Sequence, residues 1–507
     1  MRLTRRALVT TAATVLGLGG LVACGSSSNS TGGGAGGTLT LITSTAPSSI
    51  NPLLVGYGNS ATQTVDLAYS SFFDWLGGDR FEPVLATGYK FIGSGNKEIR
   101  ITLRKGLKFS DGAALNAQAE KTFLEYFMDA KAQGSETVKR LVKSISTPNE
   151  TTVDIKFTQP YPDAPLLFSD GGAWGSPISP KALSGDTDQL GYHTYGAGAY
   201  ELDSTVSGST YTYVPNPNYY DTSAQHWDKV VVKVIANTDS ALQTVKGTAH
   251  SVMQGTWKQK SQASSASLTE TTSGAQLTYM LMLTDRAGKV TPALGDVKVR
   301  QALNYAVDRS AIADLVNGTA NEQIVAKGTA GYYSDPIYSQ DAAKAKELLT
   351  EAGYPDGFSF KLLVPGYEPT LVSAAQVLAD DLAKANITMK IVTAPTFQQF
   401  LQQQSSMKYS ADFEQWESTT MFSAAQQLIE PNGYVNKAHD SDADLNKQIA
   451  KASVLTGSAA TNAWQDFSQL VSEKAWFVPL ASTDQVFYSN DVTVPVNGLY
   501  PNPVTMS

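Results

Sequence analysis

The chain has 507 residues, of which 42% are apolar; it is too long for a single hydrophobic core, so at least two domains are expected. Its formal net charge of −8 argues against a nucleic-acid-binding protein, which needs a basic face. Its one cysteine, Cys24, excludes a disulfide framework and a cysteine-based zinc or iron–sulfur site within one chain.

The N-terminus has the pattern of an export signal. Residues 1–6 carry three arginines and no acid, and residues 7–23 are uncharged and rather short for a bilayer span. The stretch Leu21-Val22-Ala23-Cys24 resembles a bacterial lipobox, in which a peptidase cleaves before a cysteine that carries diacylglycerol. We therefore expect a lipoprotein signal peptide over residues 1–23 and lipid attachment at Cys24. The alternative is a cleaved secretory signal with an incidental cysteine.

Residues 24–37 are rich in glycine and serine and contain nothing that could bury apolar surface. Such a composition predicts a flexible tether. No later apolar run approaches the length of a bilayer span. We expect the folded body to lie on the outer face of the cytoplasmic membrane, held by the lipid, which is the periplasmic side in a cell with an outer membrane.

The first part of the expected body is rich in strands. Alternating apolar residues predict strands over residues 38–44, 98–104, 152–158 and 227–235. Asn116 precedes a run with helical spacing and is expected to cap a helix there.

The pattern changes after about residue 275. Helical periodicity predicts helices over residues 296–317, 341–352, 371–385, 443–452 and 463–474, with a strand–helix–strand unit from 358 to 394. Strand-like segments return at 477–482 and 484–490. A helix-rich block inserted between two strand-rich parts needs at least two chain crossings, and paired crossings make a hinge.

No catalytic or metal-binding motif is present. The four histidines are widely scattered, and there is no H-E-x-x-H, no G-x-S-x-G and no phosphate-binding loop. We therefore expect no catalytic residue, no metal and no cofactor. Carboxylate pairs assembled by the fold leave a secreted hydrolase as an alternative.

Several segments resemble a known family. Residues 83–89 (PVLATGY) and 101–123 (ITLRKGLKFSDGAALNAQAEKTF) resemble the signature of extracellular solute-binding proteins of bacterial ABC importers, family 5. Further segments agree in order, at residues 195–221, 227–235, 295–312 and 341–357.

The resemblance implies an α/β fold, the two-lobed clamshell of type II periplasmic binding proteins. Lobe I is then expected over residues 38–282 and 479–507, with an extra subdomain near 83–187, and lobe II over 283–478. The resemblance also implies a monomer. The two lobes would close on a ligand without modifying it, and the closed protein would dock on the permease subunits of an ABC importer.

The resemblance also implies ligand-binding residues in lobe II. Peptide-binding relatives carry a Trp-x-Ala-Asp stretch whose aspartate pairs with the ligand's ammonium. The aligned stretch here is Trp416-Glu417-Ser418-Thr419, so the tryptophan is present and Thr419 replaces the aspartate. We therefore expect Trp416, Glu417 and Thr419 at the ligand, with Glu417 or Glu414 as a substitute carboxylate.

Trp174 and Tyr57 are two further candidates. Trp174 lies on a Gly- and Pro-rich segment, where loops often carry binding residues, although it could instead plug the lobe I sheet. Aromatic faces beside amide side chains also suit sugars. An oligosaccharide is therefore the alternative to a peptide as the ligand.

Overall fold

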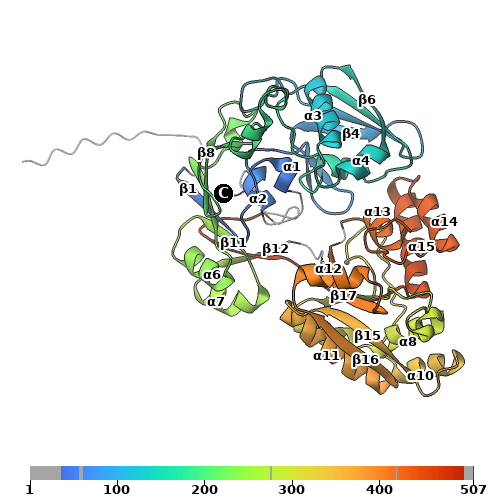
Figure 1. Ribbon diagram of the computed structural model, residues 1–507. Coiled ribbons are helices and arrows are strands. Elements are labelled where there is room, and N and C mark those ends of the chain that lie inside the picture. Colours follow the sequence, from blue (N-terminus) through green and yellow to red (C-terminus); the bar gives the residue numbers. More distant parts are fainter. Residues whose placement is uncertain are drawn as a thin grey trace, which may run out of the picture.

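The computed structural model describes residues 36–55, 61–172, 174–273, 277–417, 419–495 and 506. The chain forms two lobes, each built on one large mixed β-sheet, with a smaller subdomain attached to the first (Figure 1). The expected mixed α/β architecture with two lobes is confirmed. Across the described ranges, no helix has both the length and the apolar character needed to cross a membrane.

The sheet of lobe I has seven strands in the order β12-β19-β11-β1-β10-β9-β8. Their bounds are β1 Thr38–Thr43, β8 Tyr200–Val206, β9 Thr210–Pro215, β10 Lys229–Val234, β11 Ser251–Gly255, β12 Thr269–Thr272 and β19 Val486–Asn490. The central strands β10, β1 and β11 are parallel. Their neighbours β9 and β19 are antiparallel to them, and the outermost strands β8 and β12 are antiparallel to β9 and β19. Every residue of β1 after its first is buried, as expected for a strand covered on both faces.

Helices and one hairpin surround this sheet. Their bounds are α1 Pro52–Val55, α2 Thr62–Asp66, α5 Pro180–Leu183, α6 Thr238–Lys246, α7 Lys260–Ser265, β2 Phe73–Trp75 and β3 Phe81–Pro83. One continuous hydrophobic core joins most of this lobe to the subdomain.

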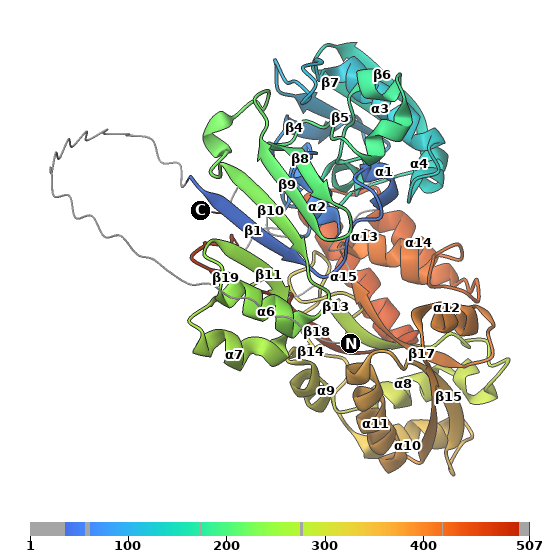
Figure 2. The ribbon, with the colours of Figure 1, turned by 60° about the vertical axis from the view of Figure 1, so that its left-hand side comes forward.

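The subdomain is a four-stranded antiparallel sheet in the order β4-β5-β7-β6 with helices on one side (Figure 2). Its elements are β4 Ala86–Phe91, β5 Glu98–Leu103, β6 Val142–Asn149, β7 Thr152–Phe157, α3 Ala117–Asp129 and α4 Ser135–Leu141. Strand β5 alternates between buried and half-buried residues, as its sequence predicts. Asn116 caps α3 as expected, because its Oδ1 accepts a hydrogen bond of 2.9 Å from the backbone N–H of Ala119.

The sheet of lobe II has six strands in the order β14-β18-β13-β17-β15-β16. Their bounds are β13 Leu277–Met282, β14 Thr319–Ala320, β15 Phe358–Pro365, β16 Ile387–Ala394, β17 Ala411–Glu417 and β18 Phe477–Thr483. The helices are α8 Val297–Ala306, α9 Arg309–Val316, α10 Ala342–Glu351, α11 Pro369–Lys384, α12 Phe397–Ser405, α13 Met421–Ala424, α14 Ala443–Ala452 and α15 Gly457–Lys474. Strands β15 and β16 are parallel and are joined by α11, which is the expected strand–helix–strand unit.

The structure corrects one expected helix. Residues 296–317 form two helices, α8 and α9, and not one. Val307 has an extended backbone, and Asp308 caps α9 by accepting hydrogen bonds from the N–H groups of Ser310 and Ala311. An aspartate inside a helical pattern can start a new helix, and periodicity alone does not reveal the break.

Two strands of the lobe II sheet extend past the expected lobe boundaries. Strand β13, whose residues fall within the range 38–282 expected for lobe I, pairs with β17 and β18. Strand β18 continues in the lobe II sheet to Thr483, beyond the expected end at residue 478. These pairings join segments far apart in the chain, which local sequence patterns do not encode.

Candidate functional site

The chain passes twice between the two large sheets. Strand β12 ends at Thr272 and β13 begins at Leu277, and β18 ends at Thr483 and β19 begins at Val486. Because these two short connections carry the chain from one sheet to the other, the junction is a candidate hinge for movement of the lobes.

The carboxyl ends of the parallel strands lie at the edges where these crossings leave the sheets (Figure 2). In lobe I, Gly255 at the end of β11 pairs with Val486 at the start of β19. In lobe II, Leu277 at the start of β13 pairs with both Glu417 at the end of β17 and Thr483 at the end of β18. Ligands of open α/β sheets bind outside the carboxyl ends of strands. These two edges are therefore the candidate walls of a ligand site.

Trp416 and Glu417 are the last two residues of β17 and lie at this edge of lobe II. Trp416 is half-buried and packs against the hydrophobic cluster of α13, α14 and α15. Glu417 points to the opposite face of the strand, and its buried Oε1 accepts no hydrogen bond from the described residues. Burial raises the pKa of Glu417 above its usual value. An ionised Glu417 therefore requires a donor or a cation, which a ligand at this edge can supply.

Glu414, the other acid considered for this role, already has partners. Gln404 Nε2 donates a hydrogen bond to Glu414 Oε1. Burial, reinforced by Glu414, raises the pKa of Asp412 well above its usual value, and a hydrogen bond joins the two carboxyl groups. The pKa of Asp412 is raised more strongly than that of Glu414, so Asp412 is the donor of this hydrogen bond and Glu414 the acceptor. Glu414 is therefore part of the interior of lobe II.

Thr419 is half-buried in the bend between β17 and α13. The next residue, Thr420, caps α13, since its Oγ1 accepts a hydrogen bond of 2.9 Å from the N–H of Ser423. The chain thus turns into a helix directly after the edge that carries Glu417. Ser418 lies outside the described residues.

Two aromatic residues at the same edge were not found by sequence reasoning. Tyr367 follows the end of β15, and Phe397 begins the helix after β16. Their side chains are 36% and 60% exposed, and their rings meet edge to face at 6.3 Å. An aromatic residue within three positions of the end of a strand in a strand–helix–strand unit is a signal that could have identified them. The carboxyl ends of such parallel strands lie at the same edge of the sheet.

The remaining sequence-predicted residues fall elsewhere. Trp174 is 0% exposed in the core of lobe I, with its ring 5.3 Å from that of Phe168. This is the position of a core residue, and in this conformation no part of the side chain is open to a ligand. Tyr57 and Cys24 lie outside the described residues.

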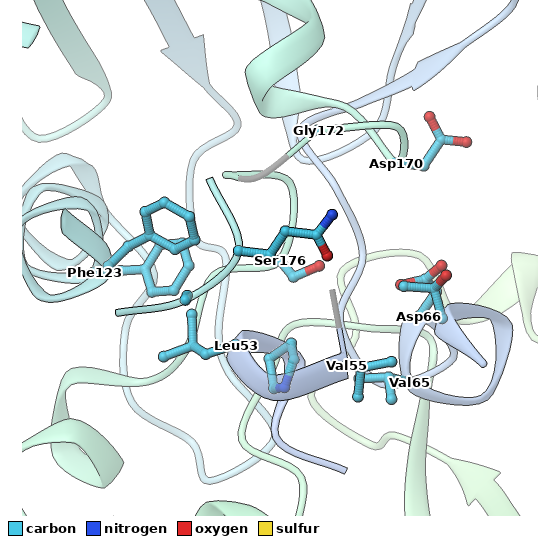
Figure 3. Close-up of a pocket in the computed structure, with 13 residues that line it drawn as sticks. Leu53, Val55, Val65, Asp66, Phe123, Asp170, Gly172 and Ser176 are labelled. Carbon is cyan, nitrogen blue, oxygen red and sulfur yellow. The ribbon is translucent and has the colours of Figure 1, made fainter. Parts of the chain in front are cut away.

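A small cavity lies inside lobe I, close to α2 and α3. Figure 3 shows Asp66 and Asp170 on one side of it and Leu53 and Phe123 on the other. Burial and the nearby Asp170 raise the pKa of Asp66 well above its usual value, and burial together with Asp74 raises the pKa of Asp170 to about 7. The cavity volume of about 20 Å³ holds a water molecule and excludes a peptide.

The subdomain contacts lobe II through polar side chains. Asn96 Nδ2 donates hydrogen bonds of 2.9 Å to the backbone carbonyls of both Ser453 and Leu455. Thr420 donates from its hydroxyl to the carboxylate of Asp163. In this conformation the subdomain and lobe II are therefore joined by polar contacts.

The described residues contain no group of three or more His, Cys, Asp or Glu side chains placed to hold a metal ion. The arrangement at the lobe II edge combines aromatic surface with a carboxyl group, that of Glu417, whose Oε1 has no donor among the described residues. Such an arrangement suits recognition of an unmodified ligand by stacking and charge.

A sequence profile of the bacterial extracellular solute-binding proteins, family 5 (middle region), matches residues 80–437. The chain belongs to this family. The match covers the subdomain, the hinge crossing from β12 to β13 and most of lobe II. The resemblance found in the sequence is thereby confirmed.

Curated relatives of this family member include glutathione-binding proteins. The glutathione-binding protein GsiB of Salmonella choleraesuis is 28% identical over 317 residues, which are 61% of this chain and 60% of that protein. GsiB of Escherichia coli is 28% identical over 324 residues, with 62% and 61% covered. The match thus spans about 60% of the length of these relatives.

Solved structures of similar fold extend over nearly the whole chain. The substrate-binding protein CtaP of Listeria monocytogenes has a TM-score of 0.79 at 18% identity, with 93% of this chain and 99% of that chain covered. The periplasmic binding protein DppA of Helicobacter pylori, in complex with the peptide STSA, has a TM-score of 0.72 at 20% identity, with 93% and 98% covered. At these identities the likeness establishes the fold.

Proposed function

We propose that this protein is the binding component of an ABC importer, which captures a short peptide between its lobes and delivers it to a membrane permease. The ligand's ammonium would pair with Glu417, and Trp416 would pack against its first residue. Thr419 lies at the same bend and would contact the backbone of the peptide. In this role the protein performs no chemistry on its cargo.

The observation that carries the proposal is that Glu417 Oε1, at the carboxyl edge of lobe II, is buried and accepts no hydrogen bond from any described residue. A peptide ammonium is a hydrogen-bond donor with a positive charge, opposite to that of the ionised Glu417. A contact that the ligand makes only when the lobes are closed shifts the population of the protein toward the closed form. Family membership supports the importer role. The names of the glutathione-binding relatives and the peptide complex of DppA support a peptide-like cargo.

A thermal-unfolding screen of the purified protein tests the ligand class. The probes are glutathione, di- to tetrapeptides, the same peptides acetylated at the N-terminus, and malto- and cello-oligosaccharides. A ligand present at a hundredfold excess over its Kd stabilises the folded protein by about 2.7 kcal/mol. We expect a response to free peptides and a weaker response to acetylated ones. A response confined to oligosaccharides would contradict the peptide proposal, and formation of a cleaved product would support a hydrolase.

The Glu417→Gln variant tests the site. Loss of one partner of a partly buried ion pair is expected to weaken peptide binding by about 3 kcal/mol, a hundredfold in Kd. Glu136→Gln makes the same change at an exposed position on α4 and is the matched control. Unchanged affinity in Glu417→Gln would show that another group binds the ammonium.

We also propose that Cys24 carries the lipid and holds the protein on the outer face of the cytoplasmic membrane. The lipobox-like sequence before Cys24 supports this proposal. In cells expressing the full chain, we expect fatty-acid labelling and membrane association that the Cys24→Ser variant loses. Membrane association without labelling in the unmodified protein would contradict it.

A further inference from the structure

A second pocket lies between the subdomain and lobe II, and neither Trp416 nor Glu417 lines it. Its volume is about 260 Å³. Its walls come from β3, β4 and the chain near Asp163 on one side, and from α13 and α15 on the other. Figure 1 shows the subdomain, with β4 and α4, beside the helices α13 and α15 of lobe II. The pocket is therefore complete only when the two lobes meet as they do here.

Aromatic side chains line both walls. On the subdomain side, Tyr89 meets Phe81 and Phe91 edge to face, with ring centroids 5.8 Å and 6.5 Å apart. On the lobe II side, Phe422 meets Trp464 edge to face at 6.1 Å. Aromatic faces attract cations because the ring quadrupole is negative above the plane.

The charged residues described in the pocket lining are all acidic. Asp79 and Asp163 line the pocket, and of the described residues in its walls none is Lys, Arg or His. Asp163 accepts a hydrogen bond from the hydroxyl of Thr420 across the lobe boundary, and the N–H of Ser423 also bonds to it. Burial raises the pKa of Asp163 to about 7, so ionising this carboxyl inside the pocket is costly without a compensating charge. An anionic ligand would be repelled here, and a cation would be favoured.

The size of the pocket limits what it can hold. A cavity of about 150 Å³ accommodates benzene, so this larger one can accept a six-membered ring with a short chain, or an extended alkyl chain. Thr420 lies four residues beyond Trp416, at most about 14 Å along the chain. A ligand of peptide size held at the first edge is therefore long enough to extend into the second pocket.

We propose that this interlobe pocket binds an organic cation with an apolar body, an ammonium or guanidinium group on a ring or alkyl chain. Asp163 and Asp79 balance the charge, and the aromatic walls contact the apolar part. The cation is supplied either by a free amine or by a side chain of a peptide cargo, the second source resting on the proposed function. In either case the ligand bridges the subdomain and lobe II and stabilises the closed arrangement.

Binding of a free amine is tested with three probes of nearly equal size and different charge: 2-phenylethylamine, 2-phenylethanol and phenylacetate. Calorimetric titration of the full chain should give measurable affinity for the amine, about tenfold weaker affinity for the alcohol and no binding of the acid. Equal affinity for all three, or no binding of the amine at millimolar concentration, would overturn the proposal.

Variants locate the site of the amine. Asp163→Asn keeps an acceptor for Thr420 and removes the charge, and it should weaken amine binding about tenfold while leaving alcohol binding unchanged. Phe81→Ala should weaken both probes. Asp188→Asn, the same change at an exposed position of lobe I, is the control and should alter neither. If Asp163→Asn and Asp188→Asn behave alike, the charge is not recognised by this pocket.

The peptide arm compares two dipeptides that differ only in side-chain charge, Gly-Lys and Gly-norleucine. A preference for Gly-Lys that disappears in Asp163→Asn, together with competition between Gly-Lys and the amine, identifies the cargo side chain as the occupant. Amine binding without a preference for Gly-Lys and without competition identifies a free amine. Glu417→Gln should weaken both dipeptides equally, so failure of the proposed peptide site is seen separately from failure of this pocket.

Discussion

Glu120 in the subdomain and Glu417 at the edge of lobe II both have carboxyl oxygens that are buried and accept no hydrogen bond from the described part of the chain. Glu120 is on α3, 1% exposed, and packed within the subdomain. Glu417 ends β17 beside the chain crossings, where a ligand can approach. The comparison shows that an unsatisfied carboxyl group has opposite consequences in the two regions. Inside the subdomain it lowers the stability of the fold, whereas at the edge of lobe II a ligand can supply the missing hydrogen bond or positive charge.

The largest expected effect on stability comes from replacing Glu120. Because no donor in the described part of the chain satisfies its carboxyl group, Glu120→Leu should increase the free energy of unfolding by about 2 kcal/mol at pH 8. Glu417→Leu should increase it less, since Glu417 is only half-buried. Urea unfolding of both variants and of the unmodified protein measures the difference. A Glu120→Leu protein less stable than the original would mean that Glu120 has a favourable partner.

The buried acids also predict how stability depends on pH. Burial raises the pKa of Glu120, Asp66 and Asp170 in the folded protein. An acid with a raised folded-state pKa contributes stability that is complete below its unfolded pKa, near 4, and is lost as the pH rises through the folded value, about 7 for Asp170.

The free energy of unfolding should therefore be higher at pH 5 than at pH 8, by on the order of 1–2 kcal/mol. Glu120→Gln should reduce this difference in the free energy of unfolding between pH 5 and pH 8. Glu417→Gln should reduce the same difference less. Calorimetric melting at the two pH values measures both. A higher melting temperature at pH 8 would contradict the assignment of these acids.

A smaller effect is expected at the contact between the lobes. Asn96→Gly removes two hydrogen bonds to carbonyls of lobe II and keeps the positive φ of 52° at this position without strain. The closed form should lose about 1 kcal/mol, which weakens peptide binding about fivefold. Thermal unfolding without ligand should change little by comparison. An unchanged affinity would show that this contact does not contribute to closure.

Local sequence patterns predicted much of the fold. Alternation over residues 98–104 predicted β5, and Asn116 predicted the start of α3. The family resemblance, and not periodicity, implied the two-lobed arrangement. The break at Val307 and the pairing of β13 with β18 were missed, because a cap inside a periodic run and a long-range strand pair depend on tertiary structure.

The candidate site was predictable only in part. The aligned stretch singled out Trp416 and Glu417, which lie at the end of β17. It could not show that Glu414 has a hydrogen-bond partner whereas Glu417 Oε1 has none among the described residues. Tyr367 and Phe397 were missed because their position depends on which strand ends share one edge. Composition could not distinguish a core position from a binding position for Trp174.

The most direct test of the central claim is a double-mutant cycle on the proposed ion pair. Calorimetric titration would measure the Kd of one responding peptide and of its N-acetylated form, for the unmodified protein and for Glu417→Gln. We expect acetylation to weaken binding to the unmodified protein about a hundredfold and to have little further effect in Glu417→Gln, because both changes remove the same interaction. Additive losses from the two changes would contradict the account, since they would show that the ammonium and Glu417 do not interact.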